Sequence, residues 1–369
     1  MQYFYSFDEF SIPYWIRGLY WGIYMSIFAF AVWKLLLSAT KYNKQKEVSC
    51  LFGVFFALYA VFYCINPDYF RYREWLNATS ISDWTKEEFY IFTVLFCQSL
   101  PFDYPYELFR LIVWGGGVFI AYHIYRLYRR WLLPGFTLLL LFVFNAGVFS
   151  YARASLAITI YFLGIALYLL HDRKMIKLLG IAVAVSSYFF HRELLIGIVV
   201  LPCLFIPLER KEFSFLSIYL LLFAIGAVSF VASNLQLLDQ MFDSDEISSK
   251  IEEFSDKEQG VFRLSTLVGY LKYFYPFCLL TTTLWKKKEH LSVIGMYRIT
   301  YGIMLATVAF MAVFGLRSTY VYRTMYITMI PLTLLISYGY SHGLFTKQQL
   351  LIVMIITVLS SSVRFFNAQ

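Results

Sequence analysis

Apolar residues fill most of this chain in long uninterrupted runs, and short polar connectors separate one run from the next. About twelve runs reach ~15–23 residues, the length that an α-helix needs to cross a bilayer. Because apolar residues are continuous within a run and do not alternate with polar ones, the pattern predicts helices and not strands. The predicted spans lie near residues 16–37, 48–66, 107–125, 133–150, 155–170, 175–190, 194–208, 214–233, 265–284, 292–314, 323–340 and 348–363.

Composition favours one polytopic membrane domain over residues 1–369. Hydrophobic residues make up 60% of the chain and charged residues 15%, whereas a soluble protein carries about 25% charged residues. Lysines follow the first apolar run instead of preceding it, so we expect a retained membrane helix and not a cleaved signal peptide. The net charge of +8 is spread over helix ends and connectors, which argues against nucleic acid as a partner.

Basic residues predict the orientation of these spans. The alternate connectors KYNKQK, YRLYRR, HDRK, ERK and WKKK are rich in Lys and Arg, so we assign them to the cytoplasm. Both termini then lie outside, together with long loops at about 67–107 and 234–264. The first loop contains an apolar but interrupted stretch at 85–101, for which we expect an interfacial or re-entrant helix. Short outer turns are expected at Tyr151–Ser155, His191–Glu193 and Gly315–Thr324.

Lysine and arginine divide unequally between the two predicted sides. The cytoplasmic side receives 11 Lys and 6 Arg, and the outer side receives 4 Lys and 10 Arg. Arginine is therefore concentrated on the outer side, where the positive-inside rule does not require basic residues. Since its guanidinium binds phosphate or carboxylate through two parallel hydrogen bonds and keeps its charge, the split favours an anionic substrate on the outer side.

The first outer cluster follows the second predicted span. It combines a carboxylate with two arginines and two tyrosines, in the order Asp68, Tyr69, Arg71, Tyr72 and Arg73. A helix end with an interfacial aromatic belt would have the same composition. The alternative is a site for an anion or a sugar.

Three further outer clusters repeat this chemistry. Arg153 begins a predicted helix, where a cation is unfavourable against the helix dipole, and small residues flank it. His191 ends another helix and is followed by Arg192 and Glu193; an imidazole is a suitable proton acceptor near neutral pH. Snorkelling of the arginine and a purely structural histidine are the simpler alternatives.

The fourth cluster, residues 315–323, contains Arg317 and Arg323 together with two tyrosines. Four such clusters on one side predict a large anionic substrate that enters from the outer leaflet. The chain has no P-loop, HExxH or GxSxG sequence and no CxxC pair among its five cysteines, so we expect neither a metal nor another cofactor. The run Trp114–Gly117 is expected to allow close helix packing.

The segments NPDYFRYREW, YARASLAITIYFLGIALYLL and SSYFFHRELL resemble the EpsG-like and Wzy-type polysaccharide polymerases. The resemblance covers about residues 60–200 and is carried by an Asp-Tyr and a Tyr in the first long outer loop, an Arg-x-x-x-Ala helix start and a helix ending in Phe-His. One departure is Arg192, followed by Glu193, where a small polar residue is expected after the histidine. The matching residues are Asp68, Tyr69, Tyr72, Arg153, Ala157, Phe190 and His191.

The resemblance implies an all-α, GT-C-like bundle in the bacterial cytoplasmic membrane, with its active site facing outward. Such enzymes join oligosaccharide repeat units carried on undecaprenyl diphosphate, for O-antigen, capsule or exopolysaccharide, without a metal. The implied partners are the lipid-linked donor and acceptor, the bilayer and a chain-length regulator.

This chemistry requires anion-binding groups and a base. We expect Arg153, with Arg317 or Arg323, to bind the diphosphate, because arginine stabilises the charge that develops on the leaving group. His191 is the preferred general base, with Asp68 or Glu193 as alternatives. The expected glycan-binding residues are Tyr69, Arg71, Tyr72, Arg73 and Arg192.

Three other functions remain open at this stage. A GT-C glycosyltransferase would use a polyprenyl-monophosphate sugar, with Asp68 as its base or metal ligand. A flippase or transporter of lipid-linked glycans would place charges deep within the spans, and a membrane acyltransferase would have a histidine in the middle of a span.

Overall fold

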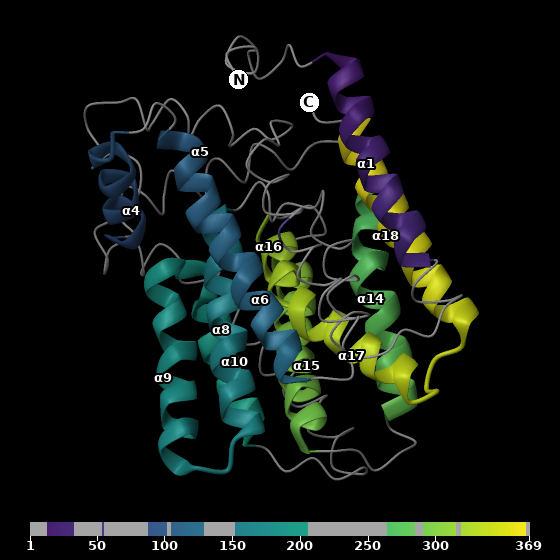
Figure 1. Cartoon of the computed structure of the whole chain (residues 1–369). Helices are drawn as coiled ribbons and strands as arrows, with labels where there is room; N and C mark the ends of the chain where they lie inside the picture. Colours follow the sequence, from purple (N-terminus) through teal and green to yellow (C-terminus); the bar gives the residue numbers. More distant parts are fainter. Residues whose placement is uncertain are drawn as a thin grey trace.

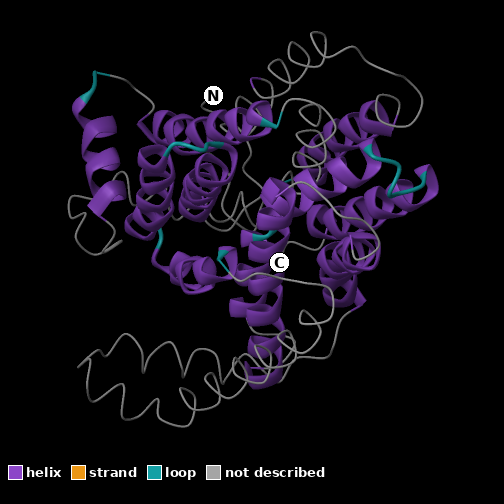
Figure 2. Ribbon diagram, turned by 90° about the horizontal axis from the view of Figure 1, so that it is seen from below, coloured by secondary structure: helices purple, strands orange, loops and turns teal. Residues whose placement is uncertain are grey.

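The computed structural model describes residues 13–32, 54, 88–101, 105–128, 152–205, 264–284, 291–314 and 319–366. Every regular element in these residues is helical, as the hydropathy pattern predicts (Figures 1 and 2). The first half contains α1 (Tyr14–Val32), α4 (Glu88–Ser99), α5 (Pro105–Arg110), the π-helical turn η3 (Leu111–Gly115), α6 (Gly116–Leu127), α8 (Ala152–Leu170) and α9 (Lys174–Phe190). The second half contains the 3₁₀ turn η5 (Arg192–Leu194), α10 (Leu195–Val200), the 3₁₀ turn η6 (Leu201–Leu204), α14 (Leu264–Leu284), α15 (Leu291–Phe314), α16 (Thr319–Ile327), α17 (Met329–Ser341) and α18 (Lys347–Phe366).

The helix ends fall into two sets at opposite sides of the bundle. In Figure 1 the upper side holds the beginnings of α1, α5, α8 and α14 and the ends of α9 and α18. The lower side holds the end of α6, the turn between α8 and α9, and the beginning of α15, whereas α18 begins nearer to mid-height. The upper set is the one that the charge pattern assigns to the outer side. The arrangement therefore agrees with the predicted alternation of connectors.

Large apolar side chains are exposed on the surface of this bundle. On α4, α9 and α10, the exposed fractions are 68% for Phe92, 77% for Met175, 70% for Phe189 and 69% for Val199. A soluble monomer rarely exposes so many neighbouring apolar groups, whereas a bilayer solvates them. These faces fit a protein whose helices lie in lipid.

One continuous helical stretch, Pro105–Leu127, is both long enough and apolar enough to span a membrane among the described residues. Shorter apolar helices accompany it at Phe89–Ser99, Ala154–Leu170, Leu195–Leu204, Met329–Tyr340 and Lys347–Ser362. The predicted spans 48–66, 133–150 and 214–233 lie outside the described residues, and so do most of the loops 67–107 and 234–264. The number of twelve spans stays a prediction.

Prolines change two of the predicted spans. The span expected at 194–208 is α-helical only to Val200, because Pro202 has no amide hydrogen to donate to the Ile198 carbonyl. This carbonyl accepts instead from the amide of Leu201, and the chain continues as the 3₁₀ turn η6. The span expected at 323–340 is divided at Thr328 into α16 and α17. Pro331 likewise cannot donate to the carbonyl of Ile327.

The helix α17 forms the core of the second half. It contacts α8, α14, α15, α16 and α18, and Leu332, Leu334 and Leu335 on it are completely buried. The Tyr125 hydroxyl of α6 donates to the carbonyl of Ile330 over 3.0 Å. This bond joins the two halves of the bundle through the first turn of α17.

The closest contact between helices is the hairpin of α8 and α9. A Cβ atom on Gly180 would lie 2.6 Å from the carbonyl oxygen of Gly164, and one on Gly164 would overlap the backbone of Gly180 and Ala184. By contrast, a Cβ on Gly117 would lie 3.7 Å from Ser155 and Leu156, an ordinary contact. Backbone contact at small residues replaces the interdigitation of large side chains here. The run Trp114–Gly117 also brings α6 next to the backbone of α8, in agreement with the expected close packing.

We predict that Gly164→Ala destabilises the protein. The methyl group collides with backbone atoms of α9, which cannot move aside as a flexible side chain could, so we expect a loss of about 1–3 kcal/mol. Gly18→Ala in α1 is the matched control, because nothing lies within 4 Å of its added Cβ, and alanine should stabilise that helix by about 0.5–1 kcal/mol. The melting temperatures of the purified variants in detergent measure both effects. Equal melting temperatures for the two variants would contradict the assigned contact.

We also predict that Ser99 and Asp172 face opposite sides of the membrane. Both residues are exposed, Ser99 at the end of α4 and Asp172 in the turn between α8 and α9. In a background without native cysteines, Ser99→Cys should react with a membrane-impermeant maleimide in intact cells, and Asp172→Cys only after permeabilisation. The reverse labelling pattern would overturn the assigned orientation.

Candidate functional site

The structure describes some of the expected site residues and not others. His191, Arg192 and Arg323 are described completely, whereas only the backbone is described for Arg153 and Glu193. The remaining expected residues lie outside the described part of the chain; they are Asp68, Tyr69, Arg71, Tyr72, Arg73 and Arg317.

Arg153 lies in the first turn of α8, next to the π-helical turn η3. The register follows from Gly117, whose added Cβ would lie 3.7 Å from the backbone of Leu156. Both helices begin at the upper side of the bundle (Figure 1), so counting back three residues places Arg153 beside η3. Contacts between α8 and η3 agree with this register. The predicted anion-binding residue is thus held at the start of a well-packed helix.

The turn η3 also sets the position of Arg110. A π-helical turn contains one residue more than an α-helical turn, so it shifts the faces of α5 relative to those of α6, and such turns are frequent at functional sites. Arg110 precedes the turn directly, is only 2% exposed, and its guanidinium lies 5.6 Å from the ring centre of Tyr106. Glu107 on the same helix is also buried.

His191 ends α9 in an extended conformation, with φ −161° and ψ 113°. Its amide donates to the carbonyl of Ser187 over 3.1 Å, and its carbonyl accepts from Leu194 over 3.0 Å. The side chain is half-buried, and the neighbouring Arg192 is exposed. These bonds fix the backbone of the turn from which the predicted base extends.

The helix α4 covers this turn. The ring of Phe89 lies 4.4 Å from that of Phe190, and Tyr90 lies 6.5 Å from Phe109 of α5. With 12 residues, α4 is shorter than the ~20 that a span requires. This length agrees with the predicted interfacial or re-entrant helix, which contacts α9 at Phe190, the residue before His191.

Arg323 lies within α16 and is half-buried. The sequence predicted an outer turn at Gly315–Thr324, but the residues from Thr319 onward are helical. The prediction of a turn was wrong from Thr319 onward, because aromatic and β-branched residues pack in an apolar helical bundle as readily as they occupy a turn. Three residues further along, the ring of Tyr326 lies 6.2 Å from that of Tyr273 on α14.

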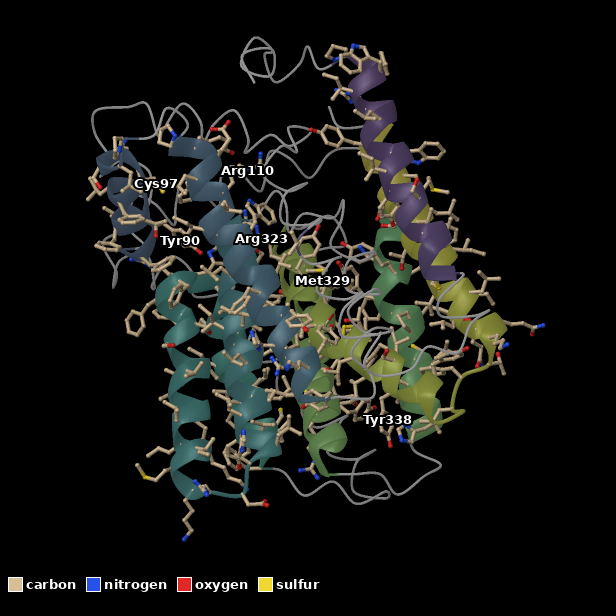
Figure 3. The ribbon with its side chains drawn as sticks, viewed as in Figure 1. Tyr90, Cys97, Arg110, Arg323, Met329 and Tyr338 are labelled. Atoms are coloured by element: carbon tan, nitrogen blue, oxygen red, sulfur yellow. The ribbon has the colours of Figure 1, made fainter. Side chains whose placement is uncertain are left out.

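Sequence reasoning missed four buried charged residues. Their exposed fractions are 7% for Arg17, 9% for Glu107, 2% for Arg110 and 2% for Lys272. Figure 3 labels Arg110 and Arg323, which lie in the upper half of the bundle on α5 and α16. The available signal was the presence of an ionisable residue within a predicted apolar span, which marks a functional candidate by default. Arg17, Arg110 and Lys272 had been counted only among the outer-side cations, and Glu107 had not been singled out.

A basic residue in the lower half has a different role. Arg298 of α15 donates from Nη1 to the carbonyl of Leu204 over 3.2 Å. A cation at the end of a helix satisfies a carbonyl that has no helical partner. Within the described ranges, no three His, Cys, Asp or Glu side chains come together as a metal site requires.

Comparison with known proteins gives one match. The family model of the EpsG family matches residues 47–368. No curated protein and no solved structure matches the chain.

We predict that Gly117→Cys and Ser155→Cys together form a disulfide on mild oxidation. An added Cβ on Gly117 lies 3.7 Å from Oγ of Ser155, the atom that the sulfur of Ser155→Cys replaces, so the two cysteine side chains would be adjacent. Gly115→Cys with Ser155→Cys is the control and should stay reduced, because the Cβ of residue 115 contacts only Leu111 of its own helix. The loss of maleimide reactivity in a background without native cysteines measures the bond. A disulfide in the control pair alone would refute the register that places Arg153 beside η3.

Proposed function

The chain belongs to the EpsG family, and from this premise we propose that it polymerises undecaprenyl-diphosphate-linked oligosaccharide units. The family indicates a membrane protein of polysaccharide biosynthesis. The finer proposal is a glycosyltransferase of the Wzy type, with a GT-C-like bundle, that works on the outer face of the bacterial cytoplasmic membrane and needs no metal. Its product would be O-antigen, capsule or exopolysaccharide.

The observation that carries the proposal is the positive charge inside the upper half of the bundle. Arg110 and Lys272 are buried, and Arg323 is half-buried, while Arg153 begins α8 at the same side. Placing permanent charges in an apolar bundle is unfavourable. Buried cations of this kind mark a functional candidate, and a ligand with several negative charges at membrane level, such as a lipid diphosphate, has the chemistry that they bind.

The proposed reaction is a single displacement at the anomeric carbon of the donor glycan. The bond from this carbon to the diphosphate oxygen breaks, and a new bond forms to a hydroxyl oxygen of the acceptor. The hydroxyl proton passes to the base, for which we propose His191, with Asp68 or Glu193 as alternatives. The lipid diphosphate departs with the electron pair of the broken bond, and the anomeric configuration inverts.

Arginine side chains assist the leaving group in this scheme. We assign Arg153, with Arg323 or Arg317, to the diphosphate, because preformed cations stabilise the charge that grows in the transition state. The tyrosines and arginines of the first outer cluster, together with Arg192, would contact the glycan. The donor, the acceptor and a chain-length regulator are the proposed partners.

One observation favours a second candidate, a transporter of lipid-linked glycans. Such a protein requires charges deep within its spans, and Lys272 is the ninth residue of α14, about 12 Å from the beginning of that helix. The two functions predict different phenotypes for a deletion strain. Loss of a polymerase leaves single repeat units on the cell surface, whereas loss of a transporter leaves none.

We predict that Arg153→Ala abolishes chain extension. In a deletion strain, the wild-type gene should restore a ladder of surface glycans, and Arg153→Ala should leave core carrying one repeat unit, because the diphosphate loses its main cation. Arg173→Ala is the matched control, since Arg173 is exposed at the opposite end of the α8–α9 hairpin, and its ladder should be normal. Gel analysis of the glycans and immunoblots of the protein measure the outcome. A normal ladder with Arg153→Ala would remove that residue from the site, and a deletion strain without any surface glycan would favour the transporter.

A further inference from the structure

The helix α9 is apolar and exposed along one side. The exposed fractions on this side are 64% for Leu178, 38% for Val185 and 70% for Phe189, and Ala182 between them is also exposed. The spacing of these four residues, four, three and four positions, keeps them on one face of the helix. The opposite face packs closely against α8 at Gly180. These four exposed residues form a continuous apolar surface, the α9 stripe, at the edge of the bundle (Figure 1).

The α9 stripe has the length of one lipid leaflet. From Leu178 to Phe189, the rise of the helix gives a length of about 16 Å. The hydrocarbon core of a bilayer is about 30 Å thick, so one leaflet accounts for about 15 Å. A single acyl chain can therefore lie along the whole stripe.

A cation lies at the lower end of the α9 stripe. Lys174 precedes Leu178 by four residues, so it lies on the same face, one helical turn beyond the stripe. Its side chain is exposed and makes no hydrogen bond, ion pair or ring contact with the described part of the chain. Lys177, by contrast, lies 5.7 Å from the ring centre of Tyr168 on α8. The charge of Lys174 is thus available to a group outside the protein.

The residues around Lys174 add to the positive charge. Residues 172–177 contain three basic residues and one acid. The acid, Asp172, is exposed and forms no ion pair within the described residues. The positive-inside rule accounts for cations in this connector, but it does not require one of them to be in register with an exposed apolar stripe. This register is the observation that points to a lipid.

We propose that the α9 stripe and Lys174 bind an anionic phospholipid of the leaflet next to the α8–α9 turn. An acyl chain lies along the stripe, and the phosphate accepts a charge-assisted hydrogen bond from the ammonium group of Lys174. Cations at this level of a membrane are attracted to anionic lipids, whereas a zwitterionic lipid carries its own ammonium group and has no net charge. The proposal goes beyond the glycan chemistry above, because the reaction scheme does not use this surface.

The experiment places a photoreactive benzophenone amino acid at position 178 of the full chain, in nanodiscs of equal parts phosphatidylglycerol and phosphatidylcholine. After illumination, mass spectrometry of the protein gives the ratio of the two crosslinked lipids. With Lys174 present, phosphatidylglycerol should exceed phosphatidylcholine about fivefold, the gain expected for one cation at an anionic lipid. Lys174→Gln should make the two lipids about equal, and Lys174→Arg should keep the preference, because the charge is retained.

Two matched controls accompany this measurement. The same probe at position 199 reports on another exposed apolar side chain, since Val199 is 69% exposed and α10 contains no Lys or Arg. The two lipids should be crosslinked about equally there. Lys347→Gln removes an exposed cation at the beginning of α18, and it should leave the ratio at position 178 unchanged.

Four results would overturn the proposal. Equal crosslinking of both lipids at position 178 with Lys174 present would show that the surface does not select anionic lipid. A preference that persists in Lys174→Gln would remove this residue from the site, and the same preference at position 199 would assign it to the net charge of the protein. Crosslinking of position 178 to a second copy of the chain would identify a protein interface instead. None of these measurements depends on glycan transfer, so they leave the proposed function untouched.

Discussion

Permanent positive charge inside an apolar bundle is the constraint on which the arrangement of this protein depends. Arginine cannot lose its proton in a protein, so a buried guanidinium must be matched by its surroundings. In the described part of the chain, tyrosine rings repeatedly provide this environment: Arg17, Arg110 and Lys272 lie 5.8, 5.6 and 5.4 Å from tyrosine ring centres. A cation–π contact contributes about 0.5–2 kcal/mol, less than the several kcal/mol of desolvation for a buried ion. The tyrosine rings therefore account for only part of the environment that these buried cations require.

Tyrosine side chains also join helices of this bundle through hydrogen bonds. The Tyr161 hydroxyl donates to the carbonyl of Gly197 over 2.6 Å, connecting α8 to α10, and Tyr125 connects α6 to α17 in the same way. In an apolar medium, a hydroxyl bonded to a carbonyl satisfies groups that water cannot reach. The high aromatic content of the chain, 21%, therefore supports the interior as well as a lipid-facing surface.

The packing explains how a rigid frame and a charged region can coexist. The α8–α9 hairpin closes tightly at Gly164 and Gly180 and holds the start of α8 and the turn at His191 at one end. The π-helical turn η3 follows Arg110 directly, and Pro276 lies four residues after Lys272 within the continuous helix α14. Further breaks in helical geometry lie at η6 and at Thr328.

Helical class, the apolar segments and the alternation of their ends could be predicted from the sequence, because hydropathy and Lys/Arg bias are properties of short segments. The EpsG resemblance likewise rested on short local patterns around Arg153 and His191. Tertiary structure alone decided that Arg110 and Lys272 are buried, since burial depends on which helix faces meet. It also decided that the helix containing Arg323 is joined to α14 through Tyr326 and Tyr273. Contacts between residues 50 or more positions apart leave no periodic signal along the chain, and the physical environment of a charge is set by such contacts.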